Sequence, residues 1–244
     1  ASFNFAYADK DGNIMFLHNS LTPRRDPRYD WRQYLPGDDS ALIWKENLSF
    51  SQLPQVVNPK SGYVHSANQT PFNVTAPADN PRLEDYAPGH GFQMDMTNRA
   101  QRGLELFAEL GPISEAEFSA IKHDKYYSPN APYASYLLQI AAAQFTDPQL
   151  VEAQVLLASW DLGTDLENNA AALGTCVFLA AERDDQRATH SEQQIAELLG
   201  GCVDKLIVAK GRIDPPWGEV NRHVRGELNV PVAGGPDILR AIYG

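Results

Sequence analysis

The residue whose chemistry stands out is Asn68, which follows a short strand-like run that begins at Gly62 and is closed by Pro71. A side-chain amide N–H at the mouth of a strand can stabilise the negative oxygen that forms when a nucleophile adds to an amide carbonyl. The glycine and the proline fix where the run begins and ends. The alternative is a turn asparagine whose side chain bonds to its own backbone, and it also fits these residues.

Short motifs surround Asn68 in a definite order: Asn4–Ile14, Pro23-Arg24, Leu35–Gly37, Trp44, Leu53-Pro54 and Asn58–Pro71. Through about residue 110, this order resembles the penicillin acylase (penicillin amidase) family of N-terminal-nucleophile hydrolases, in the interior of the large (β) subunit. Two later runs, Pro216–Arg222 and Pro231–Asp237, look most like the acyl-homoserine-lactone and aculeacin-type acylases. The resemblance implies an αββα sandwich and hydrolysis of an amide bond.

The resemblance assigns roles to two residues of the chain. Asn68 matches the oxyanion-hole asparagine, and Arg99 matches the arginine that organises the asparagine and the amino group of the nucleophile. Arg102 is a rival for the second match, because residues three apart on a helix are neighbours. The apolar stripe of that helix predicts that Arg99 points toward Asn68 and that Arg102 is more exposed.

The nucleophile of such enzymes is an N-terminal serine whose own α-amino group takes the proton. Ser2 is the second residue of the chain and lies in a strand pattern, so its nitrogen is a peptide N–H and cannot act as the base. We therefore expect the nucleophile to lie outside this span, and we expect the span by itself to be inactive.

Some members of the family bind calcium, and the resemblance places two possible ligands on this chain. They are the carbonyl of Pro27, in the segment Asp26–Arg28, and the carboxylate of Asp79. Calcium takes about six to eight oxygen ligands, so two oxygens do not make a site. No other cofactor is expected.

Composition excludes several classes of protein. The formal net charge of −11 and the pI near 4.9, without any cluster of Lys and Arg, argue against a nucleic-acid partner. No apolar run reaches the length of a membrane span, and no signal-peptide pattern follows Ala1. Cys176 and Cys202 stand outside any zinc-finger spacing and are either a disulfide or two buried thiols. The four tryptophans are interpreted as core or loop anchors.

The expected elements form an α+β chain in which helices are segregated from strands. A hairpin turns at Asp11-Gly12, a long loop follows with a short strand at 41–44, and a third strand is expected at 62–67. Helices are expected at 97–110, 114–123, 132–145, 148–158, 166–183 and 191–208, then a strand pair at 217–233 and a short helix at 236–242.

Three parts are expected: residues 1–91 as the strand and long-loop part of the hydrolase core, 92–210 as a helical block, and 211–244 as a return to strands.

The leading hypothesis is a segment of a periplasmic or secreted, autoprocessed acylase. It would act on an N-acylated small molecule such as a quorum-sensing acyl-homoserine lactone, a lipopeptide or a β-lactam antibiotic. The expected partners are a small (α) subunit and the remainder of the large subunit. The alternative is a non-catalytic binding or scaffold domain, or an inactive fragment, of the same fold.

Overall fold

The computed structural model describes residues 2–108, 111–181 and 189–241. The chain forms two compact units, residues 1–100 with 107–109 and residues 101–106 with 110–244. The chain contains both helices and strands, as the predicted α+β class requires. The predicted three-part division of the chain stays a prediction.

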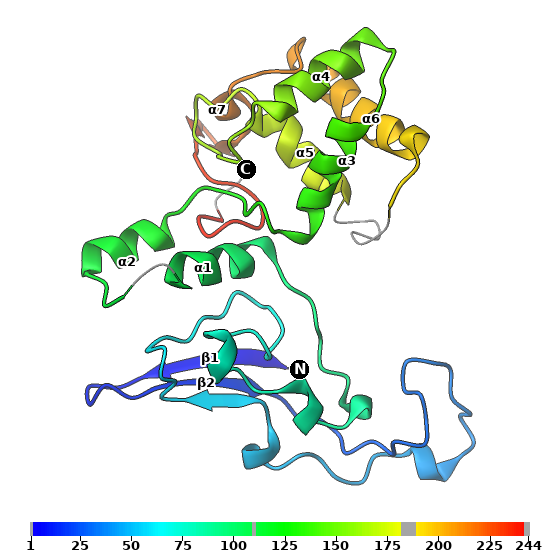
Figure 1. Cartoon of the computed structure of the whole chain (residues 1–244), viewed down its shortest axis with the longest axis vertical. Helices are drawn as coiled ribbons and strands as arrows, with labels where there is room; N and C mark the ends of the chain where they lie inside the picture. The colour runs from blue at the N-terminus through cyan, green and yellow to red at the C-terminus, as the bar shows by residue number, and fades with distance from the viewer. Residues whose placement is uncertain (1, 109–110, 182–188, 242–244) are drawn as a thin grey trace. The chain divides into compact units, whose positions relative to one another are not determined.

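The first unit contains a three-stranded antiparallel sheet in the order β1-β2-β3 (Figure 1). Its strands are β1 (Phe3–Ala8), β2 (Ile14–Asn19) and β3 (Gln55–Val57). The predicted hairpin is confirmed: Gly12 has a φ of 85°, and Asp9 Oδ1 accepts the backbone N–H groups of Asp11 and Asn13 at 3.0 and 2.9 Å. An Asp-Gly turn suits this hairpin because glycine adopts positive φ without strain.

Both faces of this sheet are apolar. Phe16 and Val56 pack with Val74 on one face, while Leu17 packs with Leu48 and Leu53 on the other. Beside Leu17, the β1 side chains of that second face are about half exposed: Phe3 at 57%, Phe5 at 45% and Tyr7 at 45%. The described part of the unit therefore covers this face only in part.

Two predicted strands of the first unit are wrong. Residues 41–44 lie in and after the 3-10 helix η1 (Ser40–Leu42), because the Asp39 carboxylate accepts the backbone N–H of Ala41 and tightens the chain into a turn. Residues 62–67 form no strand, and the third strand of the sheet is β3 instead. The rest of the long loop carries four further 3-10 helices among the described residues: η2 (Phe50–Gln52), η3 (Pro77–Asp79), η4 (Leu83–Asp85) and η5 (Pro88–His90).

Most predicted helices are confirmed, with shifted ends. They are α1 (Asn98–Ala108), α2 (Glu115–Lys122), η6 (Pro132–Ala134) running into α3 (Ser135–Ala142), α4 (Pro148–Ala158), α5 (Ala171–Ala181) and α6 (Glu192–Lys210). The capping box that begins α2 is present, since Ser114 and Glu117 bond to each other's backbone N–H. Residues 109–110 and 182–183, at two predicted helix ends, lie outside the described residues.

The last part of the chain differs from its prediction at two places. The predicted strand pair is shorter, with β4 (Arg222–Arg225) and β5 (Leu228–Pro231) preceded by the short helix α7 (Trp217–Val220). The predicted helix at 236–242 is absent through residue 241, the last one described. Asp237 has a φ of 50°, which a right-handed helix cannot contain.

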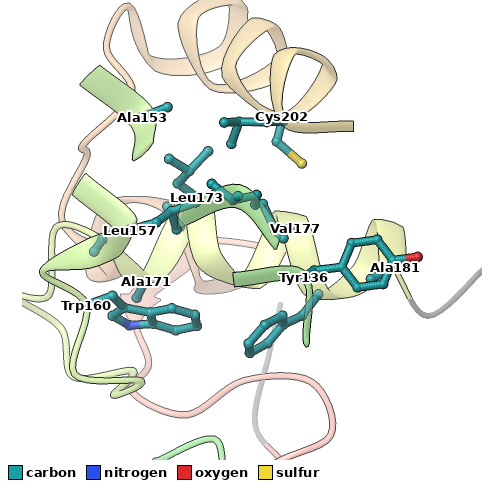
Figure 2. Close-up of a cluster of buried hydrophobic side chains, with 14 of the residues drawn as sticks. Tyr136, Ala153, Leu157, Trp160, Ala171, Leu173, Val177, Ala181 and Cys202 are labelled. Atoms are coloured by element: carbon teal, nitrogen blue, oxygen red, sulfur yellow. The ribbon is translucent and has the colours of Figure 1, made fainter. Parts of the chain in front are cut away.

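The main core surrounds α5, which packs against α3, α4 and α6. Figure 2 shows Leu173, Val177 and Trp160 among the side chains that fill this core. A disulfide between Cys176 of α5 and Cys202 of α6 joins two helices of the core. The two cysteines are 26 residues apart, and closing a loop of that length stabilises a fold by roughly 3 kcal/mol. Among the described residues, no helix has the length and apolarity to cross a membrane.

Gly174 should tolerate no larger side chain, because a Cβ at this position would overlap the indole ring of Trp160. We expect Gly174→Ala to lower the free energy of unfolding by about 1–3 kcal/mol through overpacking. The matched control is Gly201→Ala in α6, where a Cβ would meet nothing within 4 Å. That change should leave stability unchanged or raise it by up to about 1 kcal/mol. Urea denaturation measures both, and equal effects would contradict this account of the core.

Candidate functional site

Asn68 lies in an exposed loop and has a left-handed backbone, with a φ of 65°. Asparagine tolerates this conformation better than most residues, because its short polar side chain bonds locally. The side chain does not take the alternative role of a turn asparagine in the described structure, because its Oδ1 atom accepts a hydrogen bond from Arg99. The loop therefore directs the Asn68 amide away from its own backbone.

Gln69 braces this loop from inside. Its side chain is only 3% exposed, and its Nε2 atom donates to the carbonyls of His65 and Asn73 at 3.0 and 3.2 Å. Its Oε1 atom accepts the backbone N–H of Ala67 at 2.6 Å. One buried amide thus satisfies three backbone groups, two of them in residues 62–67, while the backbone N–H of His65 bonds to the carbonyl of Val74 at 2.7 Å.

Thr97 connects the loop to the first turn of α1. Its hydroxyl accepts the backbone N–H of Ala100 at 3.2 Å, which caps the helix, and donates to the carbonyl of Ala67 at 3.2 Å. The same hydroxyl therefore fixes the start of the helix that carries Arg99 and the residue that precedes Asn68. Ala100 is fully buried, as the predicted apolar face of the helix requires.

The Arg99 guanidinium points toward Asn68, as predicted, and its Nη2 atom donates to Asn68 Oδ1 at 2.9 Å. A guanidinium can only donate, so the atom that faces it must be the amide oxygen. The Nδ2 group of Asn68 then faces away from Arg99 with its N–H bonds available to an acceptor. The arginine thereby selects one of the two orientations of the amide.

Arg102 has a different partner. Its Nε and Nη2 atoms donate to the two carboxylate oxygens of Asp124 at 3.1 and 3.0 Å, and its side chain is 24% exposed. A bidentate pair of this kind orients both side chains. Arg102 is therefore engaged in an ion pair that the sequence did not indicate, and Arg99 is the arginine that contacts Asn68. Both arginines are half-buried, so the structure does not show the greater exposure predicted for Arg102.

His65 lies beside this pair. Burial lowers the pKa of its imidazole below the usual range, and the positive charge of Arg99 acts in the same direction, while a hydrogen bond with the Arg99 backbone opposes it in part. The ring packs against Phe107, with 5.9 Å between centroids, and its Nε2 atom is buried without a partner among the described residues. His65 therefore adds no positive charge near Asn68 at neutral pH.

The two residues suggested for calcium lie on separate loop segments. The Asp79 carboxylate already accepts the backbone N–H of Ser61 at 2.8 Å, and Pro27 is exposed in the loop before η1. Among the described residues, no group of three or more His, Cys, Asp or Glu could hold a metal ion. Pro27 and Asp79 would provide two of the six to eight ligands that calcium requires, and the site stays a prediction.

Sequence reasoning predicted the contact of Arg99 with Asn68, but it missed Gln69. Gln69 gave no signal except its place directly after Asn68, because a glutamine in a polar loop is normally exposed. The burial of the Gln69 side chain, which the sequence does not indicate, is what allows it to bond to the backbone of the loop.

Removing the Gln69 brace should loosen the loop. We expect Gln69→Ala to lower the free energy of unfolding by about 1–3 kcal/mol, because it leaves three backbone groups without their partner. The matched control is Gln93→Ala, since Gln93 is exposed in the same unit. Denaturant titration of both variants tests the brace, and an equal, small effect would contradict it.

A family model and a curated protein are similar to this chain. The family model for penicillin amidase matches residues 1–242. Penicillin G acylase of Escherichia coli is 39% identical over 172 residues, which are 69% of this chain and 19% of that protein. The chain thus matches about a fifth of the length of this curated relative. Because the family model covers nearly every residue, the chain belongs to the penicillin amidase family.

Proposed function

We propose that this chain is an internal part of the large subunit of an acylase that hydrolyses the amide bond of an N-acylated small molecule. Membership of the penicillin amidase family supports an amide hydrolase. The single observation that carries the mechanism is the hydrogen bond from Arg99 Nη2 to Asn68 Oδ1, which leaves the Asn68 Nδ2 group as a donor. Candidate substrates are an acyl-homoserine lactone, a lipopeptide and a β-lactam.

The proposed reaction is acyl transfer. The hydroxyl of an N-terminal serine outside this span adds to the amide carbonyl of the substrate, and the α-amino group of that serine takes the proton. The carbonyl oxygen becomes negative in the tetrahedral intermediate, and Asn68 Nδ2–H donates to it. The intermediate then expels the amine, which takes up the proton, and water hydrolyses the resulting acyl ester. A donor of this kind lowers the barrier by about 3 kcal/mol.

Arg99 is proposed to position Asn68 rather than to touch the scissile amide. Its hydrogen bond holds the Asn68 carbonyl oxygen away from the oxyanion, which would repel the partial negative charge of that oxygen. Preorganisation of this kind matters because a donor that is already oriented loses no free energy through reorientation during the reaction. The neutral His65 next to the pair is consistent with a site in which Arg99 is the adjacent cation.

The proposal places the first unit in an αββα sandwich. The sheet β1-β2-β3 has apolar side chains on both faces, and the exposed Phe3, Phe5 and Tyr7 suit coverage by a further layer. That layer, the small (α) subunit and the remainder of the large subunit are the proposed partners, formed from one autoprocessed precursor.

The disulfide Cys176–Cys202 supports a periplasmic or secreted protein, because disulfides persist in oxidising compartments.

Replacing Asn68 in the intact enzyme tests the mechanism. We expect Asn68→Ala to lower kcat about a hundredfold or more with a smaller change in KM, because the lost N–H acts on charge that develops only in the transition state. Release of the amine from a chromogenic N-acyl amide measures both constants. Ser66→Ala is the control, because Ser66 is an exposed residue of the same loop. An unchanged kcat in Asn68→Ala would favour the alternative, a binding or scaffold domain.

A further inference from the structure

A second feature of the first unit is a cavity of about 1050 Å³, formed by two segments that are far apart in the sequence. Residues 25–32 provide one side, and residues of the segment 83–94 provide the other. Its volume lies just above the range, about 300–1,000 Å³, that is typical of sites for small organic ligands. Asn68 and Arg99 do not line it.

The charges that line this cavity are nearly all neutralised by neighbours. Each lining cation or anion other than Arg25 has an ion-pair partner: Arg28 with Asp26, Arg32 with Asp30 and Glu84 with Arg82. Arg25 forms no ion pair with any residue that the structure describes. The cavity therefore carries one positive charge that the described part of the chain does not balance.

The Arg25 guanidinium is held in place without a carboxylate. Its Nη1 atom donates to the carbonyl of Gly89 at 3.1 Å, and its Cζ atom lies 5.6 and 5.3 Å from the ring centroids of Trp31 and Trp44. Gly91 has a φ of 71°, and a Cβ there would come within 2.5 Å of Nη1, so the close approach of this backbone requires glycine. Two aromatic rings and a backbone carbonyl thus hold the guanidinium in place without neutralising its positive charge.

The rest of the lining is largely apolar. Leu83, Tyr86, Phe92 and Met94 contribute an apolar wall, and the rings of Tyr86 and Phe92 meet edge to face with 5.4 Å between centroids. Such a wall suits a hydrocarbon or aromatic body, while the single unbalanced guanidinium suits one negative group. A small inorganic anion would leave the apolar wall in contact with water.

We propose that this cavity binds an organic carboxylate with an apolar body, with the carboxylate against Arg25 and the body against the wall formed by Leu83, Tyr86, Phe92 and Met94. Arg25 is the specificity-determining residue of the site, because it is the lining charge whose partner the ligand supplies. The proposal goes beyond the proposed acylase activity, since it concerns residues that the reaction does not use.

Isothermal titration calorimetry of the intact protein with octanoate and with octanamide, its uncharged counterpart, tests the proposal. We expect octanoate to bind at least about tenfold more tightly than octanamide. Arg25→Met should abolish this difference. Arg24→Met is the matched control, because Arg24 is the exposed neighbour, pairs with Glu46 and does not line the cavity. It should leave both affinities unchanged.

A second variant keeps the test decisive if Arg25→Met does not fold. Leu83→Trp retains the charge of Arg25 and places a larger ring in the apolar wall where the body of the ligand would lie. It should therefore weaken the binding of octanoate and octanamide alike by at least about tenfold. Three results would overturn the proposal: no binding of octanoate at millimolar concentration, equal affinity for octanoate and octanamide, or octanoate binding that survives Leu83→Trp. Binding at a different site of the intact protein would give the last result.

Discussion

The hydrogen bond from Arg99 to Asn68 is the interaction on which the candidate site depends. It joins a helix to a loop, and it gives a flexible amide a single orientation because the guanidinium has no acceptor. The interaction requires that both backbones be fixed. Thr97 caps the helix and holds the carbonyl of Ala67, while the buried Gln69 satisfies the loop from inside. The backbone on either side of the exposed Asn68 is therefore held by polar contacts that are buried or half-buried. These contacts can preorganise an amide donor that is itself exposed.

The two units are stabilised in different ways, each suited to its composition. The helical core around α5 is filled by apolar side chains on all sides of that helix and is fastened by the disulfide Cys176–Cys202. The first unit has only small apolar clusters, and its long loop is ordered instead by side-chain bonds to the backbone and by short 3-10 turns. Loops of this kind carry function because their side chains can be aimed individually. Both the Asn68 loop and the cavity around Arg25 belong to this unit.

Local signals predicted much of this architecture. The Asp-Gly hairpin, the Ser114 capping box and the helices followed from turn chemistry, capping and apolar periodicity, which act within a few residues. The failures arose where a neighbouring polar side chain bonded to the backbone of a segment that had been expected to pair as a strand. Gln69 bonds to the backbone of His65 and Ala67, and Asp39 caps the 3-10 helix Ser40–Leu42 at the start of 41–44. The resemblance to the family predicted the contact of Arg99 with Asn68, but the cavity around Arg25 joins segments about 60 residues apart and could not be predicted from either one.

A double-mutant cycle on kcat in the intact enzyme tests most directly whether Arg99 acts by orienting Asn68. The cycle compares Asn68→Ala, Arg99→Met and the double variant, with Arg102→Met as a reference because Arg102 bonds to Asp124 instead. If Arg99 works through Asn68, the double variant should be little slower than Asn68→Ala. The product of the two single-variant losses in kcat should then exceed the loss in the double variant by at least about tenfold. For the reference pair, Arg102→Met and Asn68→Ala, the losses in kcat should multiply. If the losses of Arg99→Met and Asn68→Ala also multiply, the hydrogen bond does not orient the donor and the central claim fails.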